Sequence, residues 1–128
     1  VVDLSNKKIL IVDDNKLNLK VAERLIQKYN PQIETVESGF ECLKKIEDGN
    51  IYDLIFMDIQ MPTMNGYEAA RAIRAASRSD AVRIPIIAIT ANAFSEDVKM
   101  ALAAGMNAHI AKPFELRLLK KIIRQWLK

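Results

Sequence analysis

Apolar runs of strand length alternate with amphipathic stretches of helical length along this chain. Continuous apolar runs predict strands covered on both faces, and apolar residues spaced three or four positions apart predict helices with one buried face. The predicted strands are residues 8–12, 33–36, 52–57, 86–89 and 108–111. The predicted helices are residues 17–29, 39–48, 65–76, 95–104 and 116–126. This alternation predicts an α/β fold in which helices cover both faces of a parallel sheet.

Each predicted helix has an apolar stripe that we expect to face the sheet. The stripes are Leu17, Val21, Leu25 and Tyr29 in the first helix, with Ala22 and Ile26 beside them, Phe40, Leu43 and Ile46 in the second, and Leu116, Leu119, Ile122, Ile123 and Trp126 in the last. Ser38 and Glu41 have the spacing of a capping box, and the polar residues 77–83 predict a loop. Nothing marks a second domain, so we expect one domain over residues 1–128 with a core from about residue 7.

The composition excludes several classes of protein. No apolar run reaches the roughly 18–20 residues of a membrane span, and the first residues lack the apolar core of a signal peptide. Cys42 and His109 are the single cysteine and histidine, which leaves no internal disulfide and few ligands for zinc. The net charge is +3, but the basic residues are spread over polar helix faces. We therefore expect no direct binding of nucleic acid and no membrane contact by this domain, although a basic face could dock an acidic partner domain.

Polar side chains follow four of the five predicted strands. Asp13 and Asp14 follow the first strand, Asp58 the third, Thr90 the fourth and Lys112 the fifth. Each has an ordinary explanation alone, such as a turn cap for Asp58 or a helix cap for the Asp13–Asp14 pair. In a doubly wound sheet, however, ligands bind at the carboxyl ends of the strands. The joint placement therefore predicts that these side chains meet in one shallow pocket.

Three clustered carboxylates repel one another and require a cation. Carboxylate oxygens favour a hard metal, and Mg²⁺ is usually held by one or two carboxylates with several waters. A bound metal can admit a phosphate, and an aspartate such as Asp58 can attack phosphorus to form an aspartyl-phosphate. Lys112 could neutralise developing charge, and the Thr90 hydroxyl could donate to a phosphoryl oxygen.

The chain resembles the receiver (response-regulator) domain of two-component signalling along nearly its whole length. The matching segments are residues 9–15, 57–62, 65–66, 85–91 and 112–113. The resemblance implies a flavodoxin-like, doubly wound sheet of five parallel strands in the order 2-1-3-4-5, with five helices. It implies a domain that catalyses its own phosphorylation and slow dephosphorylation without being a turnover enzyme by itself.

By this resemblance, Asp58 is the phosphoacceptor and takes its phosphoryl group from a phosphohistidine. Asp13, Asp14 and Asp58 hold Mg²⁺ or Mn²⁺, and the backbone carbonyl of Gln60 is a further ligand. The side chains of Gln60 and Asn92 flank the phosphoryl group and tune how fast water removes it.

The resemblance also assigns a switch. Thr90 supplies the switch hydroxyl and Lys112 pairs with the phosphate, while the small Ala91 leaves room for the phosphoryl donor. The peptide bond before Pro113 is cis in the family. Phosphorylation is expected to draw Thr90 and Lys112 inward and to bias a surface formed by the fourth helix, the fifth strand and the last helix, through which a homodimer could also form.

One position departs from the family pattern. Many receivers carry Tyr or Phe three residues before the lysine, where this chain has His109. His109 is either an exposed strand residue without a role or part of a modified, mildly pH-sensitive switch.

The details are most similar to receivers of hybrid sensor histidine kinases. The implied partners are a histidine kinase and a histidine phosphotransfer domain, and the implied location is the cytoplasm or the cytoplasmic portion of a membrane-bound kinase. The alternative is a stand-alone single-domain response regulator that acts through protein–protein interaction.

Three other functions fit parts of the pattern. A flavin-binding sheet would need a phosphate-cradling loop where Asp13 and Asp14 stand. A phosphohydrolase using an aspartyl-phosphate would need a substrate cap, for which no insertion is long enough. A degenerate receiver that only docks partners conflicts with the full set of site residues.

Overall fold

The computed structural model describes residues 3–76, 79–91, 95–112 and 114–127. The strands are β1 (Lys8–Val12), β2 (Gln32–Val36), β3 (Leu54–Asp58), β4 (Ile86–Thr90) and β5 (Ala108–Ala111). The helices are α1 (Lys16–Gln27), α2 (Gly39–Glu47), α3 (Gly66–Arg74), α4 (Ser79–Arg83), α5 (Ser95–Ala103) and α6 (Leu116–Trp126). None of these helices is long and apolar enough to cross a membrane.

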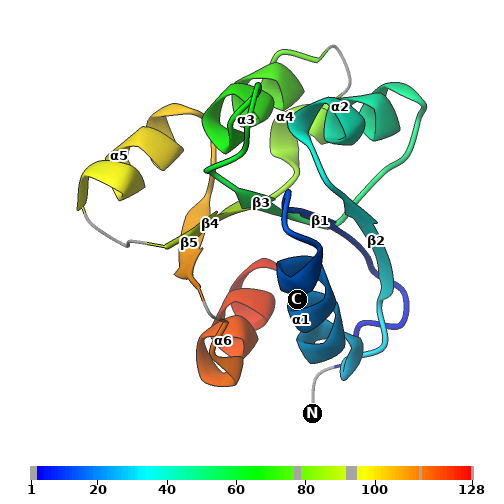
Figure 1. Ribbon diagram of the computed structural model, residues 1–128. Helices are drawn as coiled ribbons and strands as arrows, with labels where there is room; N and C mark the ends of the chain where they lie inside the picture. Colours follow the sequence, from blue (N-terminus) through cyan, green and yellow to red (C-terminus); the bar gives the residue numbers. More distant parts are fainter. Residues whose placement is uncertain (1–2, 77–78, 92–94, 113, 128) are drawn as a thin grey trace.

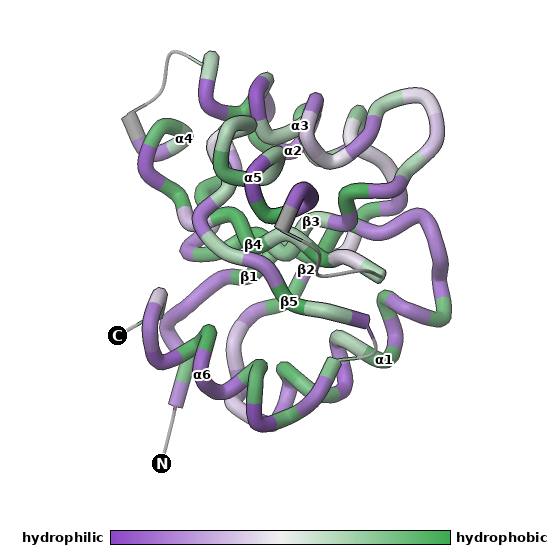
Figure 2. The backbone as a smooth tube through the Cα atoms, turned by 90° about the vertical axis from the view of Figure 1, so that its left-hand side faces the viewer, coloured by the Kyte–Doolittle hydropathy of each residue, from purple (hydrophilic) through white to green (hydrophobic). Residues whose placement is uncertain are grey.

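All five strands form one parallel sheet in the order β2-β1-β3-β4-β5, which confirms the predicted topology. Figure 1 shows α1 and α6 on one face of the sheet and the other helices on the opposite face. Each face has its own apolar core, and the central strands contribute alternate residues to the two cores. The hydropathy colouring of Figure 2 shows the apolar strands between the two helical layers.

Strand β3 lies at the centre of this arrangement. Leu54 and Phe56 belong to the core under α1 and α6, whereas Ile55 and Met57 belong to the core under α2 and α3. All four side chains are fully buried, because β1 and β4 flank the strand and helices cover both of its faces. Asp58, the last residue of β3, is therefore delivered to the sheet edge with only 2% of its surface exposed.

The prediction of a loop over residues 77–83 is wrong for residues 79–83, which form helix α4. Ala81 is buried in the core, and its carbonyl accepts a hydrogen bond of 3.0 Å from Nη1 of Arg74. This anchoring is tertiary, and a helix of five residues is too short to show helical periodicity in the sequence. The described ranges contain six helices, one more than the five expected.

The predicted apolar stripes of three helices are partly wrong. Leu17 and Val21 of α1 are 68% and 43% exposed, Phe40 of α2 is 53% exposed, and Leu116 of α6 is 37% exposed. The buried residues of α1 are Leu19, Ala22 and Ile26. Helix α1 carries two overlapping apolar stripes, and the sheet covers the one that contains Ala22 and Ile26. Spacing alone does not say which of two such stripes faces the sheet.

The helix starts agree with the local sequence signals. The Ser38 side chain caps α2 by accepting a hydrogen bond from the backbone N–H of Glu41 at 3.1 Å. The Glu41 carboxylate accepts from the N–H of Glu37, one residue before the position that a complete capping box uses. A complete box is present at α3, where Asn65 and Glu68 bond reciprocally.

The apolar core begins before residue 7. Leu4 is 2% exposed and packs in the same core as Tyr29. Its N–H donates a hydrogen bond of 2.7 Å to the carbonyl of Tyr29. This hydrogen bond holds the segment before β1 against the loop between α1 and β2.

We predict that Gly66→Ala lowers the free energy of unfolding by about 3 kcal/mol, measured by urea denaturation. A Cβ at Gly66 would collide with the Asp58 carbonyl and would lie 2.7 Å from the Cα of Ile59, so backbone would have to move. Gly49→Ala is the control, because Gly49 has a φ of +97° but no neighbour near its Cβ. That variant should cost only about 1 kcal/mol, the strain of the left-handed conformation. Equal losses in the two variants would contradict close packing of Gly66 against β3.

Candidate functional site

The carboxyl ends of four neighbouring strands bring the predicted polar residues together. Asp58 ends β3 and Thr90 ends β4, while Asp13 and Lys112 directly follow β1 and β5. Within the described ranges, Asp13, Asp58 and Thr90 are the buried polar or charged residues. Burial of a polar group is costly unless it is paired, so their gathering at one edge identifies this edge as the candidate site.

Three carboxylates form the acidic part of this site. One oxygen from each of Asp13, Asp14 and Asp58 lies within 4.8 Å of the other two. Asp13 and Asp58 are buried, whereas Asp14 is exposed and closes the cluster from the solvent side. In the part of the chain that the structure describes, no other group of three acidic, histidine or cysteine side chains is this close. The donor set is all oxygen, which suits a hard divalent cation.

Backbone N–H groups hold the two buried carboxylates in place. Oδ1 of Asp13 accepts a hydrogen bond from the N–H of Asn15 at 2.9 Å. Oδ1 of Asp58 likewise accepts from the N–H of Gln60 at 3.1 Å. In both cases, the residue two positions later donates, as in an Asx turn, and the second carboxylate oxygen stays available.

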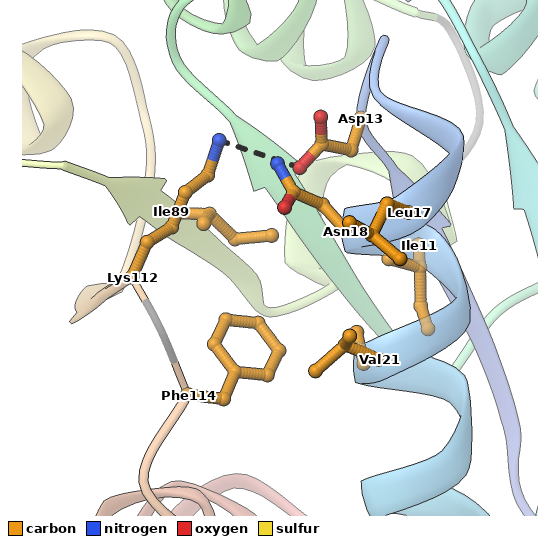
Figure 3. A pocket seen from close by; sticks show the side chains of 9 residues that line it. Ile11, Asp13, Leu17, Asn18, Val21, Ile89, Lys112 and Phe114 are labelled. Atoms are coloured by element: carbon orange, nitrogen blue, oxygen red, sulfur yellow. Dashed lines mark ion pairs between the residues drawn. The ribbon is translucent and has the colours of Figure 1, made fainter.

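Lys112 takes up those second oxygens. Its Nζ lies 3.1 Å from Oδ2 of Asp58 and 3.4 Å from Oδ2 of Asp13, and Figure 3 shows it reaching across to Asp13. Burial by itself would lower the pKa of Lys112, but the carboxylates of Asp58 and Asp13 raise it above its usual value. Lys112 therefore stays charged and provides the cation that compensates part of the acidic cluster.

The compensation is incomplete at Asp58. Burial, together with the charge of Asp13, raises the pKa of Asp58 from its usual 3.8 to about 6, against the opposing effects of the Gln60 N–H and Lys112. The folded protein therefore binds this proton more tightly than the unfolded chain does. Without a bound cation, ionisation of Asp58 costs stability as the pH rises from about 4 through about 6.

The structure brings Asp13, Asp14, Asp58 and Lys112 into contact distance, as the sequence predicted. Thr90 is buried at the end of the neighbouring strand, where its position pairs with Ala111 in the register of β4 and β5. The positions of these residues agree with the prediction, and their roles in phosphoryl chemistry stay predictions.

Other predicted residues lie at the rim or farther away. Gln60 and Ala91 are exposed and lie just beyond the ends of β3 and β4. His109 is exposed on β5, where it lines a surface groove with Leu118 and Lys121 of α6. Asn92 and Pro113 lie outside the described residues.

An apolar pocket that the sequence did not predict lies beside the acidic cluster. This pocket has a volume of about 130 Å³ and is lined by Leu17 and Val21 of α1, by Phe114, and by Asp13 and Lys112. Figure 3 shows Val21 opposite Phe114, with Leu17, Asp13 and Lys112 above them. The signal was present in the sequence, because Leu17 and Val21 stand one helical turn apart. Spacing does not distinguish this pocket from core, since an apolar stripe that faces a sheet and one that faces solvent have the same spacing.

Comparison with known proteins gives a consistent result. A family model described as the response regulator receiver domain matches residues 9–124. The chain is 40% identical over 122 residues to hybrid signal transduction histidine kinase L of Dictyostelium discoideum. That match covers 93% of this chain but 7% of the kinase, so this chain spans a small part of the relative's length.

Solved structures resemble the chain over almost its full length. The receiver domain of sensor histidine kinase PA1611 from Pseudomonas aeruginosa, solved with a magnesium ion coordinated in its active site cleft, has a TM-score of 0.84 and 38% identity. The match covers 94% of this chain and 96% of that one. A co-crystal structure of the Saccharomyces cerevisiae phosphotransfer protein Ypd1 and the receiver domain of Ssk1 gives a TM-score of 0.84 and 30% identity, over 98% of this chain and 90% of the other.

We predict that Lys112→Met raises the pKa of Asp58 above about 6 in the metal-free protein. The substitution removes the positive charge 3.1 Å from Oδ2, so the ionised carboxylate loses its nearest counter-charge. The titration is followed by NMR of the carboxyl carbon of Asp58. Lys120→Met is the control, because Lys120 is exposed on α6 and no contact links it to the acidic cluster in the described structure. A pKa in Lys112→Met equal to or below that of the unmodified protein would contradict this electrostatic assignment.

Proposed function

Because this chain belongs to the response regulator receiver domain family, we propose that it accepts a phosphoryl group from a phosphohistidine on Asp58. The observation that carries this proposal is the meeting of buried Asp58 with Asp13, Asp14 and Lys112 at the carboxyl edge of the sheet. A carboxylate that must stay ionised in a buried place is useful as a nucleophile, and its neighbours supply the charges that phosphoryl transfer requires.

The residues fit a divalent cation such as Mg²⁺ or Mn²⁺. Asp13, Asp14 and Asp58 would hold the ion, with the backbone carbonyl of Gln60 as a further ligand. Bound there, the ion would neutralise charge on the phosphoryl oxygens and offset the repulsion among the carboxylates. The raised pKa of Asp58 agrees with this assignment, because the site carries more negative charge than Lys112 alone balances.

The transfer step follows from the groups in place. A carboxylate oxygen of Asp58 attacks phosphorus, and the new P–O bond forms as the P–N bond to the donor imidazole breaks. The imidazole nitrogen keeps the electron pair of the broken bond and takes up a proton from solvent. Lys112, whose ammonium already lies 3.1 Å from Asp58, then pairs with the phosphoryl oxygens, and the Thr90 hydroxyl donates to one of them.

The partner class follows from the same reasoning. The donor would be a phosphohistidine of a histidine kinase or of a histidine phosphotransfer domain. The match to a short region of a hybrid histidine kinase supports a place for this chain within such a kinase. Leu17, Val21 and Phe114 would form the apolar part of the surface on which the donor docks, because they surround the pocket that adjoins the acidic cluster.

We predict that incubation with phosphoramidate and Mg²⁺ adds one phosphoryl group to the protein, measured by intact-mass spectrometry. Asp58→Asn should take up none, because an amide is a poor nucleophile and carries no charge to neutralise. Asp48→Asn is the control: Asp48 is an exposed carboxylate at the end of α2, and its loss should leave phosphorylation unchanged. Equal uptake by Asp58→Asn and the unmodified protein would show that another residue is the acceptor.

A second prediction separates docking from chemistry. The double variant Leu17→Ser, Val21→Ser should accept phosphate from a phosphorylated histidine phosphotransfer domain roughly tenfold more slowly, because the apolar anchors of the interface are lost. Its reaction with phosphoramidate should be unchanged, since neither side chain touches Asp58. Ile51→Ser is the matched control, because Ile51 is 61% exposed and precedes β3 at the opposite edge of the sheet. A loss of both reactions in the double variant would mean that the site itself is damaged, and a loss of neither would remove this surface from the interface.

A further inference from the structure

A tyrosine next to the site has a buried hydroxyl without a partner. Tyr67, in the first turn of α3, is 8% exposed, and its hydroxyl oxygen is buried with no hydrogen bond to any residue in the described ranges. An unsatisfied buried hydroxyl is destabilising, because the group has lost water and gained nothing in exchange. Unpaired groups of this kind therefore call for a functional explanation.

Tyr67 is linked directly to the acidic cluster through the backbone. The preceding residue, Gly66, packs against the backbone of Asp58 and Ile59, and its N–H donates a hydrogen bond of 3.1 Å to the carbonyl of Ile59. A movement of the backbone at Asp58 or Ile59 would therefore displace Gly66 and the first turn of α3.

Helix α5 carries a half-buried carboxylate, Asp97, whose charge acts on Tyr67. Ala101 and Ala104 of α5 form a stripe that is buried in the same apolar core as Tyr67, on the face of the sheet that α3 and α5 share (Figure 1). Asp97 falls on the same stripe, one turn before Ala101, and is half-buried. No hydrogen bond or ion pair of Asp97 is present among the described residues. Burial raises the pKa of the Tyr67 phenol, and the charge of Asp97 raises it further, which agrees with a carboxylate in the vicinity of the hydroxyl.

The far end of α5 is anchored. Arg74 donates to the carbonyl of Gly105 at 2.9 Å and to Oδ1 of Asn107 at 2.8 Å. Asn107 in turn bonds Ile86 at the start of β4 through both its backbone N–H and its side-chain oxygen. Because the carboxyl-terminal end is fixed in this way, a shift of α5 would move mainly its first turn, which carries Asp97.

We propose that Tyr67 is a positioning residue of the phosphorylation switch: its hydroxyl is unpaired in the resting arrangement and donates to the Asp97 carboxylate when α5 shifts toward α3 in the phosphorylated one. This inference rests on the proposed function. A hydrogen bond from a hydroxyl to a carboxylate is short and strong, so forming it favours the shifted arrangement of α5. By linkage, whatever favours that arrangement also tightens binding of the phosphoryl group or its mimic at Asp58.

The test is the affinity of the protein for beryllofluoride, a phosphoryl mimic, in the presence of Mg²⁺, measured by ¹⁹F NMR. Tyr67→Phe should bind beryllofluoride roughly tenfold more weakly, because the pair to Asp97 cannot form. Its affinity for Mg²⁺ alone should not change, and its resting stability should be equal to or higher than that of the unmodified protein. Asp97→Ala should weaken beryllofluoride binding to the same extent, and the double variant should be no weaker than either single one.

Tyr52→Phe is the matched control. Tyr52 is also buried, but its hydroxyl already donates to Oε1 of Glu34 at 2.6 Å. Its loss should lower resting stability and leave beryllofluoride affinity unchanged. Unmodified protein that binds beryllofluoride, with less than a threefold change in Tyr67→Phe, would overturn this inference alone, as would a loss of resting stability in Tyr67→Phe equal to that of Tyr52→Phe. An unmodified protein that binds no beryllofluoride would overturn the proposed function as well.

Discussion

A carboxylate at the end of a fully buried strand is the constraint on which the rest of this structure depends. Asp58 is 2% exposed, and burial raises its pKa to about 6. A charge in such a place must be compensated from the surrounding elements, because solvent does not reach it. The strand order achieves this by setting the ends of β1 and β5, with Asp13 and Lys112, around the end of β3.

The two oxygens of each buried carboxylate, Asp13 and Asp58, have different partners. One oxygen accepts an N–H from two residues later, and the other faces Lys112. The geometry is thus fixed by the chain itself, while the charge is left partly unbalanced. An incompletely neutralised group of carboxylates can bind a hard cation, whereas a fully neutralised one would have little affinity for it.

Some apolar side chains are exposed, and one polar group is buried without a hydrogen bond, although the stability of the fold requires neither feature. Leu17 and Val21 are exposed beside the site, and the Tyr67 hydroxyl is buried without a partner in the described structure. Both features lie near the acidic cluster: Leu17 and Val21 line a pocket with Asp13 and Lys112, and Tyr67 follows Gly66, which packs against the backbone of Asp58. Departures from ordinary burial are expected where a protein meets a partner or changes its arrangement.

The sequence by itself predicted the strands and the meeting of the acidic residues, and the strand order followed from the family resemblance. Residues such as 8–12 and 108–111 form continuous apolar runs, and the carboxyl ends of parallel strands all lie at one edge of the sheet. The tertiary structure alone decided which stripe of α1 is buried, that residues 79–83 form α4, and that the Tyr67 hydroxyl is buried without a hydrogen bond in the described ranges. These depend on the rotation of a helix about its axis and on contacts such as that of Arg74 with Ala81, which join residues that sequence periodicity does not relate.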